Sequence, residues 1–291
     1  MITTKGVISL SKIKINLVTI LMISISALVW IPLFMVITGS FMGKSEVTDN
    51  LAVVLKEGDT FAHWSIIPKY PTLQPYFELL LDSPRFFVMF WNSCKQVFAS
   101  LLMQLLVGVP AAWSFAKLKF KGKKIIFTIY IILMIMPFQV TMVSNYLMLS
   151  RLDLIDTYWA VILPNAFSTF PVFIMTKFFK DIPEVLIEAA KIDGANEMNT
   201  FIYIGIPMGK AGILSALVLG FLEYWNSIEQ PLVFLKDISL WPLSLYLPSI
   251  ATDNLGVSFV ASVIILLPAL LFFLAGQKHL EQGIVASGIK E

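Results

Sequence analysis

The sequence is poor in charged residues, cysteine and histidine, and each shortage excludes a class of protein. Charged residues make up 14% of the 291 positions, whereas soluble domains carry about 25%. The hydrophobic share is 57%, and the mean hydropathy is +0.81. A single cysteine, Cys94, excludes a disulfide within the chain and a cluster of thiolates around a metal. The composition therefore excludes a large soluble domain and predicts an integral membrane protein.

Sequence motifs of enzymes are also absent. The chain contains no His-Glu-x-x-His, no Gly-x-Ser-x-Gly and no Gly-x-x-x-x-Gly-Lys-Ser/Thr. Its two histidines, His63 and His279, fall on opposite sides of the membrane in the topology given below. We therefore expect no catalytic site, no metal site and no cofactor on this chain. If the chain is coupled to ATP, the ATPase is another polypeptide.

Six stretches are long and apolar enough to cross a bilayer, which takes about 20 residues as a helix. They lie at roughly 15–41, 86–116, 125–149, 157–179, 207–231 and 257–276. The first is too long for the apolar region of a signal peptide, so we expect it to be retained. Together they predict one all-α transmembrane domain over residues 1–291.

The distribution of lysine and arginine predicts the orientation, because cytoplasmic loops are enriched in basic residues. With the N-terminus inside, the inner segments contain Lys5, Lys12, Lys14, Lys117, Lys119, Lys121, Lys123, Lys124, Lys177, Lys180, Lys191, Lys210, Lys278 and Lys290. The outer segments contain only Lys44, Lys56, Lys69, Arg85, Arg151 and Lys236. This imbalance predicts that both termini and residues 181–206 lie in the cytoplasm.

Residues 181–206 form a polar stretch in which we expect a short helix. Asp181 can cap its N-terminus, with Pro183 in the first turn and Glu184 completing a capping box. Gly194 stands where a left-handed residue ends a helix, and Asn196 can cap a second helix.

This helix is predicted to be amphipathic. An apolar face consists of Val185, Ala189 and Ile192, at helical spacing. Glu184, Glu188 and Lys191 share another face, which we expect to remain in water. One interpretation is a helix that joins two spans and lies at the lipid headgroups. The other is a helix that docks on a partner, because the alanines allow close approach.

The spacing within this stretch favours docking. Glu188-Ala-Ala is followed after three residues by Gly194, and after nine more by Ile204-x-Ile206-Pro207. This pattern resembles the Glu-Ala-Ala loop of ABC-importer permeases, the helix that plugs into a cytoplasmic ATPase. The family usually has Leu at the position of Ile206. The resemblance implies that the residues coupled to the ATPase are Glu184, Glu188, Ala189, Ala190, Asp193 and Gly194.

The fifth span carries a polar stripe that is a candidate solute pathway. Its members at helical spacing are Glu223, Asn226, Ser227 and Gln230, flanked by Tyr224 and Trp225. Carboxylates and amides hydrogen-bond hydroxyl groups, and aromatic rings offer flat surfaces to sugar rings. The alternative is that the span ends near Tyr224, which leaves Glu223 at the interface and Trp225 in the aromatic belt.

Shorter matches extend the resemblance over almost the whole chain. Asn92-Ser93, Pro137-Phe138-Gln139 and Trp225-Asn226 with Pro231-Leu232 resemble the sugar-importing, maltose-type branch of ABC permeases. Ser227 stands where that branch often has an acidic residue, so the polar face differs. The resemblance implies a six-helix, type I importer permease in the bacterial cytoplasmic membrane.

The resemblance also implies the partners. They are a second, similar permease subunit, two copies of a cytoplasmic ATPase that binds ATP and Mg²⁺, and an extracytoplasmic solute-binding protein. Nucleic acid is not among them. The expected function is the translocation of a sugar or oligosaccharide.

Three alternatives remain open. The first is an ABC permease for a non-sugar solute such as an amino acid or a polyamine. The second is an ion-driven secondary transporter, which would need paired or inverted repeats that the sequence lacks. The third is a membrane enzyme, for which no acid, base or metal-ligand cluster is present.

Overall fold

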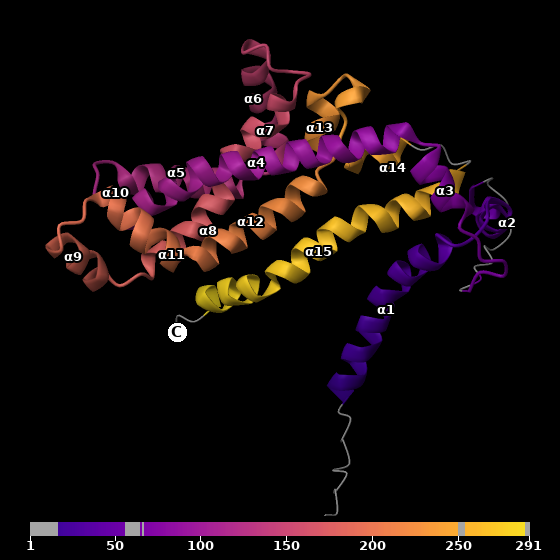
Figure 1. Cartoon of the computed structure of the whole chain (residues 1–291), viewed down its shortest axis with the longest axis horizontal. Coiled ribbons are helices and arrows are strands. Elements are labelled where there is room, and N and C mark those ends of the chain that lie inside the picture. Colours follow the sequence, from indigo (N-terminus) through magenta and orange to yellow (C-terminus); the bar gives the residue numbers. More distant parts are fainter. Residues whose placement is uncertain (1–16, 56–64, 66, 250–253, 289–291) are drawn as a thin grey trace, which may run out of the picture.

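The computed structural model describes residues 17–55, 65, 67–249 and 254–288, and these residues contain helices and no strand (Figure 1). A helix satisfies its own backbone hydrogen bonds, which a bilayer requires. Six residues from the topology prediction lie outside the described residues: Lys5, Lys12, Lys14, Lys56, His63 and Lys290. The described part has four helices suited to cross a membrane, or up to six if each of two bent pairs is one span.

Helix bounds agree with four of the predicted stretches. The first, second and sixth correspond to α1 (Leu17–Gly39), α4 (Pro84–Lys117) and α15 (Leu255–Gly288). The fourth corresponds to α7 (Tyr158–Ala166) and α8 (Thr169–Lys180), which together form one candidate span.

The span predicted at 125–149 is strongly bent. It is divided into α5 (Lys123–Ile135) and α6 (Phe138–Arg151), whose axes differ by 109°. Proline disfavours helical geometry in the residue before it. Met136 accordingly has ψ 134° ahead of Pro137, which begins α6. As a result, α6 projects to one side of the long helices and packs beside α7 (Figure 1).

The span predicted at 207–231 is also interrupted. The helix α12 (Lys210–Trp225) ends at Asn226, and α13 (Glu229–Phe234) begins after a short break. On the other side, α12 meets the segment Glu197–Met208 at a bend of 68°. The fifth span therefore ends near Tyr224, which was the alternative interpretation.

Helices α4, α8, α12 and α15 run lengthwise beside one another (Figure 1). The helix α9 (Glu184–Ile192) lies at one end of the long axis, and α2 (Lys44–Leu55) and α3 (Gln74–Leu81) lie at the other. We call these the α9 end and the α3 end. The helix α1 contacts α15 near the α3 end and then diverges from it.

The interior contains two main apolar clusters and a polar link between helices. One cluster surrounds Phe221 and Trp225, and the other surrounds Trp113 and Phe179. Between them, the Gln104 amide donates a hydrogen bond of 2.6 Å to the Tyr224 hydroxyl oxygen. The Tyr224 hydroxyl donates one of 3.1 Å to the carbonyl of Asn165. Because buried polar groups need partners, this chain of bonds fixes α4, α7 and α12 to one another.

Candidate coupling loop and central cavity

The candidate coupling loop, residues 181–206 and called the coupling loop below, contains the helix α9, which ends at the predicted position. Gly194 has φ +84°, in the left-handed region that favours glycine. Its N–H donates to the carbonyl of Lys191 at 3.1 Å, and the Ala195 N–H donates to that of Ala190 at 2.9 Å. These bonds satisfy carbonyls that a helix end leaves without partners.

The predicted capping box at the start of α9 is wrong. Pro183, with ψ 133°, is the residue before the helix, and no side chain caps it. Asp181 instead ends α8, with its N–H 3.3 Å from the Lys177 carbonyl. Since α9 starts only at Glu184, Asp181 lies too early in the chain to cap it. The Glu184 carboxylate is paired with the Lys117 ammonium at 2.9 Å.

The predicted apolar face of α9 points away from the bundle. Val185 is 72% exposed and Ile192 is 86% exposed, and Ala189 is exposed beside them. Ile187, only 5% exposed, holds the opposite side against the cluster around Trp113. The loop is thus fixed to the bundle on one side and presents small and apolar side chains on the other.

The remaining predicted loop residues are placed at the surface. Glu188 and Asp193 are exposed, and Ala190 is half-buried. Asn196 caps α10 (Glu197–Thr200) as predicted, because its side-chain oxygen accepts from the Asn199 N–H at 2.8 Å.

The loop returns to the bundle through a closely packed glycine. A π-helical turn, Phe201–Gly205, leads into α11 (Ile206–Met208). A Cβ atom added to Gly205 would lie 2.8 Å from the ring of Trp113. Only a residue without a side chain lets the backbone approach this ring, so the loop has a fixed path.

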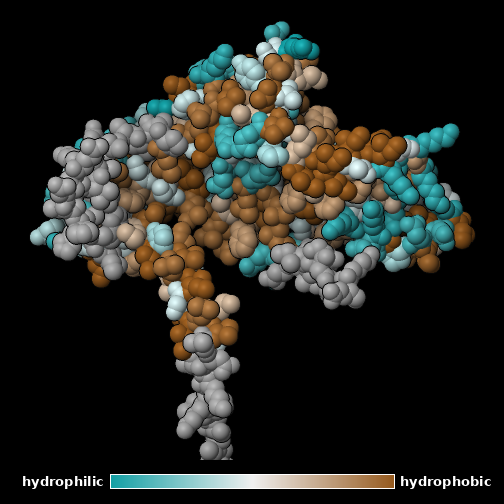
Figure 2. Space-filling model, turned by 180° about the vertical axis from the view of Figure 1, so that it is seen from behind, coloured by the Kyte–Doolittle hydropathy of each residue, from teal (hydrophilic) through white to brown (hydrophobic). Residues whose placement is uncertain are grey.

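A cavity of about 870 Å³, the central cavity, lies between α5, α6, α7, α8, α12 and α13. Five of the six predicted pathway residues line it, namely Glu223, Tyr224, Asn226, Ser227 and Gln230. They come together because the chain turns at Asn226, and not because they share a face of one helix. Figure 2 shows a hydrophilic patch in the middle of a largely hydrophobic face of the molecule.

Trp225, the sixth predicted residue, does not line the cavity. Its side chain is 2% exposed and stacks on Phe221, with ring centroids 5.5 Å apart. Its indole N–H donates to the Ile265 carbonyl at 3.0 Å. It therefore packs α12 against α15, and the prediction that it contacts solute is not supported by its position.

Two of the predicted residues that line the cavity, Tyr224 and Gln230, are buried and form hydrogen bonds within the protein. Tyr224 is 7% exposed and bonded to Gln104, and Gln230 is 4% exposed, with its amide 3.3 Å from the Val161 carbonyl. Glu223 and Asn226 are exposed. These two side chains are the more accessible of the predicted set.

Sequence reasoning did not single out Glu229, which also lines the cavity. Its carboxylate accepts a hydrogen bond of 3.4 Å from the Gln139 amide of α6. The available signal was its place just before Pro231, where the chain leaves the fifth span. The described lining contains the carboxylates Glu223 and Glu229 and neither lysine nor arginine.

Apolar helices suited to cross a membrane, a cavity with carboxylates and amides in its lining, and an exposed amphipathic helix at one end are features of a membrane-transport subunit. Residues 104–286 match the family described as the inner membrane component of binding-protein-dependent transport systems, and the chain belongs to this family. It is therefore a multi-pass permease component and not a catalytic enzyme.

Related proteins include carbohydrate permeases. The chain is 28% identical over 275 residues to the arabinooligosaccharides transport system permease protein AraQ of Bacillus subtilis, with 94% of each chain covered. It is 30% identical over 243 residues to the multiple sugar-binding transport system permease protein MsmG of Streptococcus mutans, covering 81% of this chain and 87% of MsmG.

A solved structure has the same fold. It is a chain of a bacterial ABC transporter involved in the import of the acidic polysaccharide alginate, with a TM-score of 0.77 and 20% identity. The alignment covers 90% of this chain and 94% of that one.

Proposed function

We propose that this chain is the permease subunit of an ATP-driven, binding-protein-dependent importer of a sugar or oligosaccharide. The observation that carries the proposal is the exposed apolar face of α9 at one end of a bundle whose cavity is lined in part by carboxylates and amides. The names of AraQ and MsmG, which describe sugar transport, support the class of solute.

The coupling loop contacts a separate ATPase in this proposal. Its exposed apolar residues lose contact with water on docking, which favours association. Ala189 lets the partner approach closely, while Glu188 is free to pair with a basic group of the ATPase. The chain itself binds no cofactor, and ATP and Mg²⁺ are bound by the ATPase.

The complete importer contains a second, similar permease, two ATPase subunits and a solute-binding protein outside the membrane. The α9 end and both termini lie in the cytoplasm, in agreement with the positive-inside distribution. ATP binding draws the ATPase subunits together, and each coupling loop transmits this movement to the helices around the cavity. The cavity then opens alternately to the two sides of the membrane.

Solute passes through the central cavity. Glu223 and Asn226 offer hydrogen-bond acceptors and donors to hydroxyl groups. Phe167, which is 59% exposed, lines the same cavity and offers an apolar ring surface. Polar groups beside a flat ring suit a sugar, which has hydroxyl edges and apolar faces.

The test is reconstitution of the permease pair with its ATPase and binding protein in vesicles, followed by uptake of labelled solutes. We expect ATP-dependent uptake of oligosaccharide. ATP-dependent uptake of an amino acid or polyamine instead would contradict the solute class. Uptake driven by an ion gradient without the ATPase would contradict the mechanism.

A further inference from the structure

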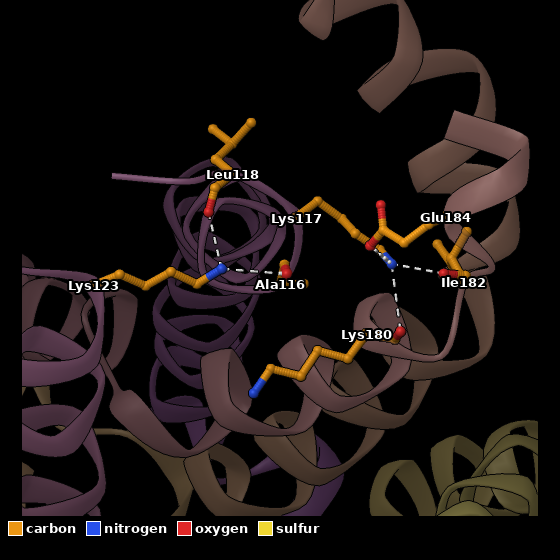
Figure 3. Close-up of polar contacts among 7 residues, drawn as sticks. All are labelled: Ala116, Lys117, Leu118, Lys123, Lys180, Ile182 and Glu184. Carbon is orange, nitrogen blue, oxygen red and sulfur yellow. Dashed lines mark hydrogen bonds and ion pairs between the residues drawn. The ribbon is translucent and has the colours of Figure 1, made fainter. Parts of the chain in front are cut away.

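Lys117 is a buried lysine at the base of the coupling loop. It lies in the last turn of α4, and its side chain is only 4% exposed. Its ammonium nitrogen lies 2.6 Å from the carbonyl oxygen of Ile182, 2.9 Å from a carboxylate oxygen of Glu184 and 3.4 Å from the carbonyl oxygen of Lys180. Figure 3 shows the side chain reaching from α4 to all three groups.

These contacts use the full hydrogen-bonding capacity of the lysine. An ammonium group has three donors, and each has an acceptor in the segment 180–184 that joins α8 to α9. Lys180 is the last residue of α8, where carbonyls lack helical partners and the helix dipole favours a cation. A buried ammonium without partners is costly, so this arrangement holds the linker in one position relative to α4.

Lys123 offers an informative comparison. Its ammonium group donates to the carbonyls of Ala116 at 3.3 Å and Leu118 at 2.9 Å. These acceptors belong to the end of α4 and the turn after it, and Figure 3 shows that the side chain remains on that side. Lys123 therefore stabilises the connection between α4 and α5, whereas Lys117 joins α4 to the coupling loop.

We propose that Lys117 is the positioning residue that makes α9 move together with α4. Without it, the loop is attached to the bundle by its two chain connections and by apolar contacts alone, those of Ile182 and Ile187 on one side of Gly194 and those of Phe201 and Ile204 on the other. With it, a displacement of α9 passes directly to α4, which packs against α7, α8 and α12, three of the helices that surround the cavity. This inference rests on the proposed coupling of α9 to an ATPase.

The test compares Lys117→Met with Lys117→Arg in the reconstituted importer. Methionine keeps an unbranched apolar stem but has no donor, while arginine keeps a charge and several donors. Lys123→Met is the matched control for loss of a carbonyl-bound lysine, and Lys121→Met controls for loss of an exposed charge. The measurements are ATPase retained on purification, solute uptake, and ATP hydrolysed per solute.

We expect Lys117→Met to retain the ATPase but to lower uptake at least about tenfold, because the variant loses three charge-assisted hydrogen bonds and the loss of one alone corresponds to about that factor. Hydrolysis should fall less, so that more ATP is consumed per solute. Lys117→Arg should restore most of the uptake, and both controls should stay within about twofold of the parent chain. An unchanged ratio of ATP to solute in Lys117→Met would overturn the proposal, as would loss of the ATPase from that complex.

A distance measurement tests the link without transport. Spin labels on cysteines introduced at Lys119 and Ile192, in a chain carrying Cys94→Ser, report the separation of the end of α4 from α9. We expect a narrow distance distribution that broadens in Lys117→Met and not in Lys123→Met. Equal widths in all variants would overturn the proposal. Failure of ATP-dependent uptake by the parent chain would instead contradict the proposed function, so the two failures are distinguishable.

Discussion

The two ends of α4 hold their neighbouring loops by different chemistry. At the α3 end, the Asn92 amide donates to the carbonyls of Ser239 at 2.6 Å and Trp241 at 3.1 Å. The Gln96 amide donates to the Leu240 carbonyl at 2.8 Å, and Ser93 accepts from the Leu243 N–H at 2.7 Å. At the α9 end, the ammonium group of Lys117 performs the corresponding function for the coupling loop.

The loops also differ in what they expose. Leu243 and Leu245, in the loop at the α3 end, are 1% and 2% exposed, whereas Val185 and Ile192 of α9 are largely exposed. One loop is therefore built into the bundle by neutral amides. The other is fixed at its base and leaves an apolar face for a partner. Changes at the first should affect stability, and changes at the second should affect coupling.

The largest effect is expected for Asn92→Leu. This change removes both bonds to the loop and leaves the Tyr158 hydroxyl, 2.7 Å from the Asn92 side-chain oxygen, without its partner. We expect a loss of about 3 kcal/mol of stability, because each unsatisfied buried group costs about 1–3 kcal/mol. Thermal unfolding in detergent measures it. The exposed neighbour Trp91→Leu is the control, and equal stability of the two variants would contradict the comparison.

Ala189→Trp should leave stability unchanged and lower uptake, the opposite of what we expect for a change in the loop at the α3 end. Ala189 is exposed, so a large ring leaves the isolated permease stable but obstructs docking of the ATPase. We expect uptake to fall at least about tenfold, as overpacking of a close contact costs about 1–3 kcal/mol. Co-purification of the ATPase and uptake in vesicles measure it. Leu81→Trp, at a position 72% exposed in α3, is the control, and normal uptake by both variants would exclude close seating of α9.

Gly194→Ala and Gly122→Ala form a matched pair. Both glycines have a left-handed backbone conformation, with φ +84° for Gly194 and +83° for Gly122. A Cβ atom added to either would have no neighbouring atom within 4 Å. Each change should therefore cost about 1 kcal/mol of local strain. Only Gly194 ends α9, so we expect uptake to fall about fivefold in Gly194→Ala, because a free-energy cost of about 1 kcal/mol corresponds to that factor. Uptake should stay near normal in Gly122→Ala. If uptake fell equally in both variants, backbone strain alone would explain the loss, and the expected role of the end of α9 would be contradicted.

The smallest effect is expected in the cavity. Glu223→Gln keeps the size and the hydrogen-bonding ability of the side chain but removes its charge. We expect the solute concentration for half-maximal uptake to rise by up to about fivefold, while ATP consumed per solute stays constant. Trp225→Phe, which changes a residue outside the cavity, should leave this concentration unchanged. If Trp225→Phe raised this concentration and Glu223→Gln did not, the solute pathway would not pass Glu223.

Local features of the coupling loop could be predicted from the sequence because they depend on neighbouring residues. Gly194 and Asn196 act within a few positions of themselves. The capping box failed because the extended backbone of Pro183 delays the start of the helix by two residues, a geometry that the pattern of residue types does not specify.

Features that depend on distant residues were not predictable in this way. The contact between Lys117 and Glu184 joins positions 67 residues apart in the chain, and no local pattern marks it. Five of the six predicted pathway residues do line the cavity, but for an incomplete reason. The break at Asn226 carries no proline or glycine, so the stripe was assigned to one helix. The turn itself, together with Glu229, forms part of the wall of the cavity.

The most direct test of the central claim is cross-linking from α9 in the assembled importer. A photoreactive amino acid replaces Ile192, and a matched one replaces Leu81 at the α3 end. The account predicts that Ile192 cross-links to the ATPase in an ATP-sensitive manner and that Leu81 does not. Absence of any ATPase cross-link from Ile192, or labelling of this position from outside sealed cells, would contradict it.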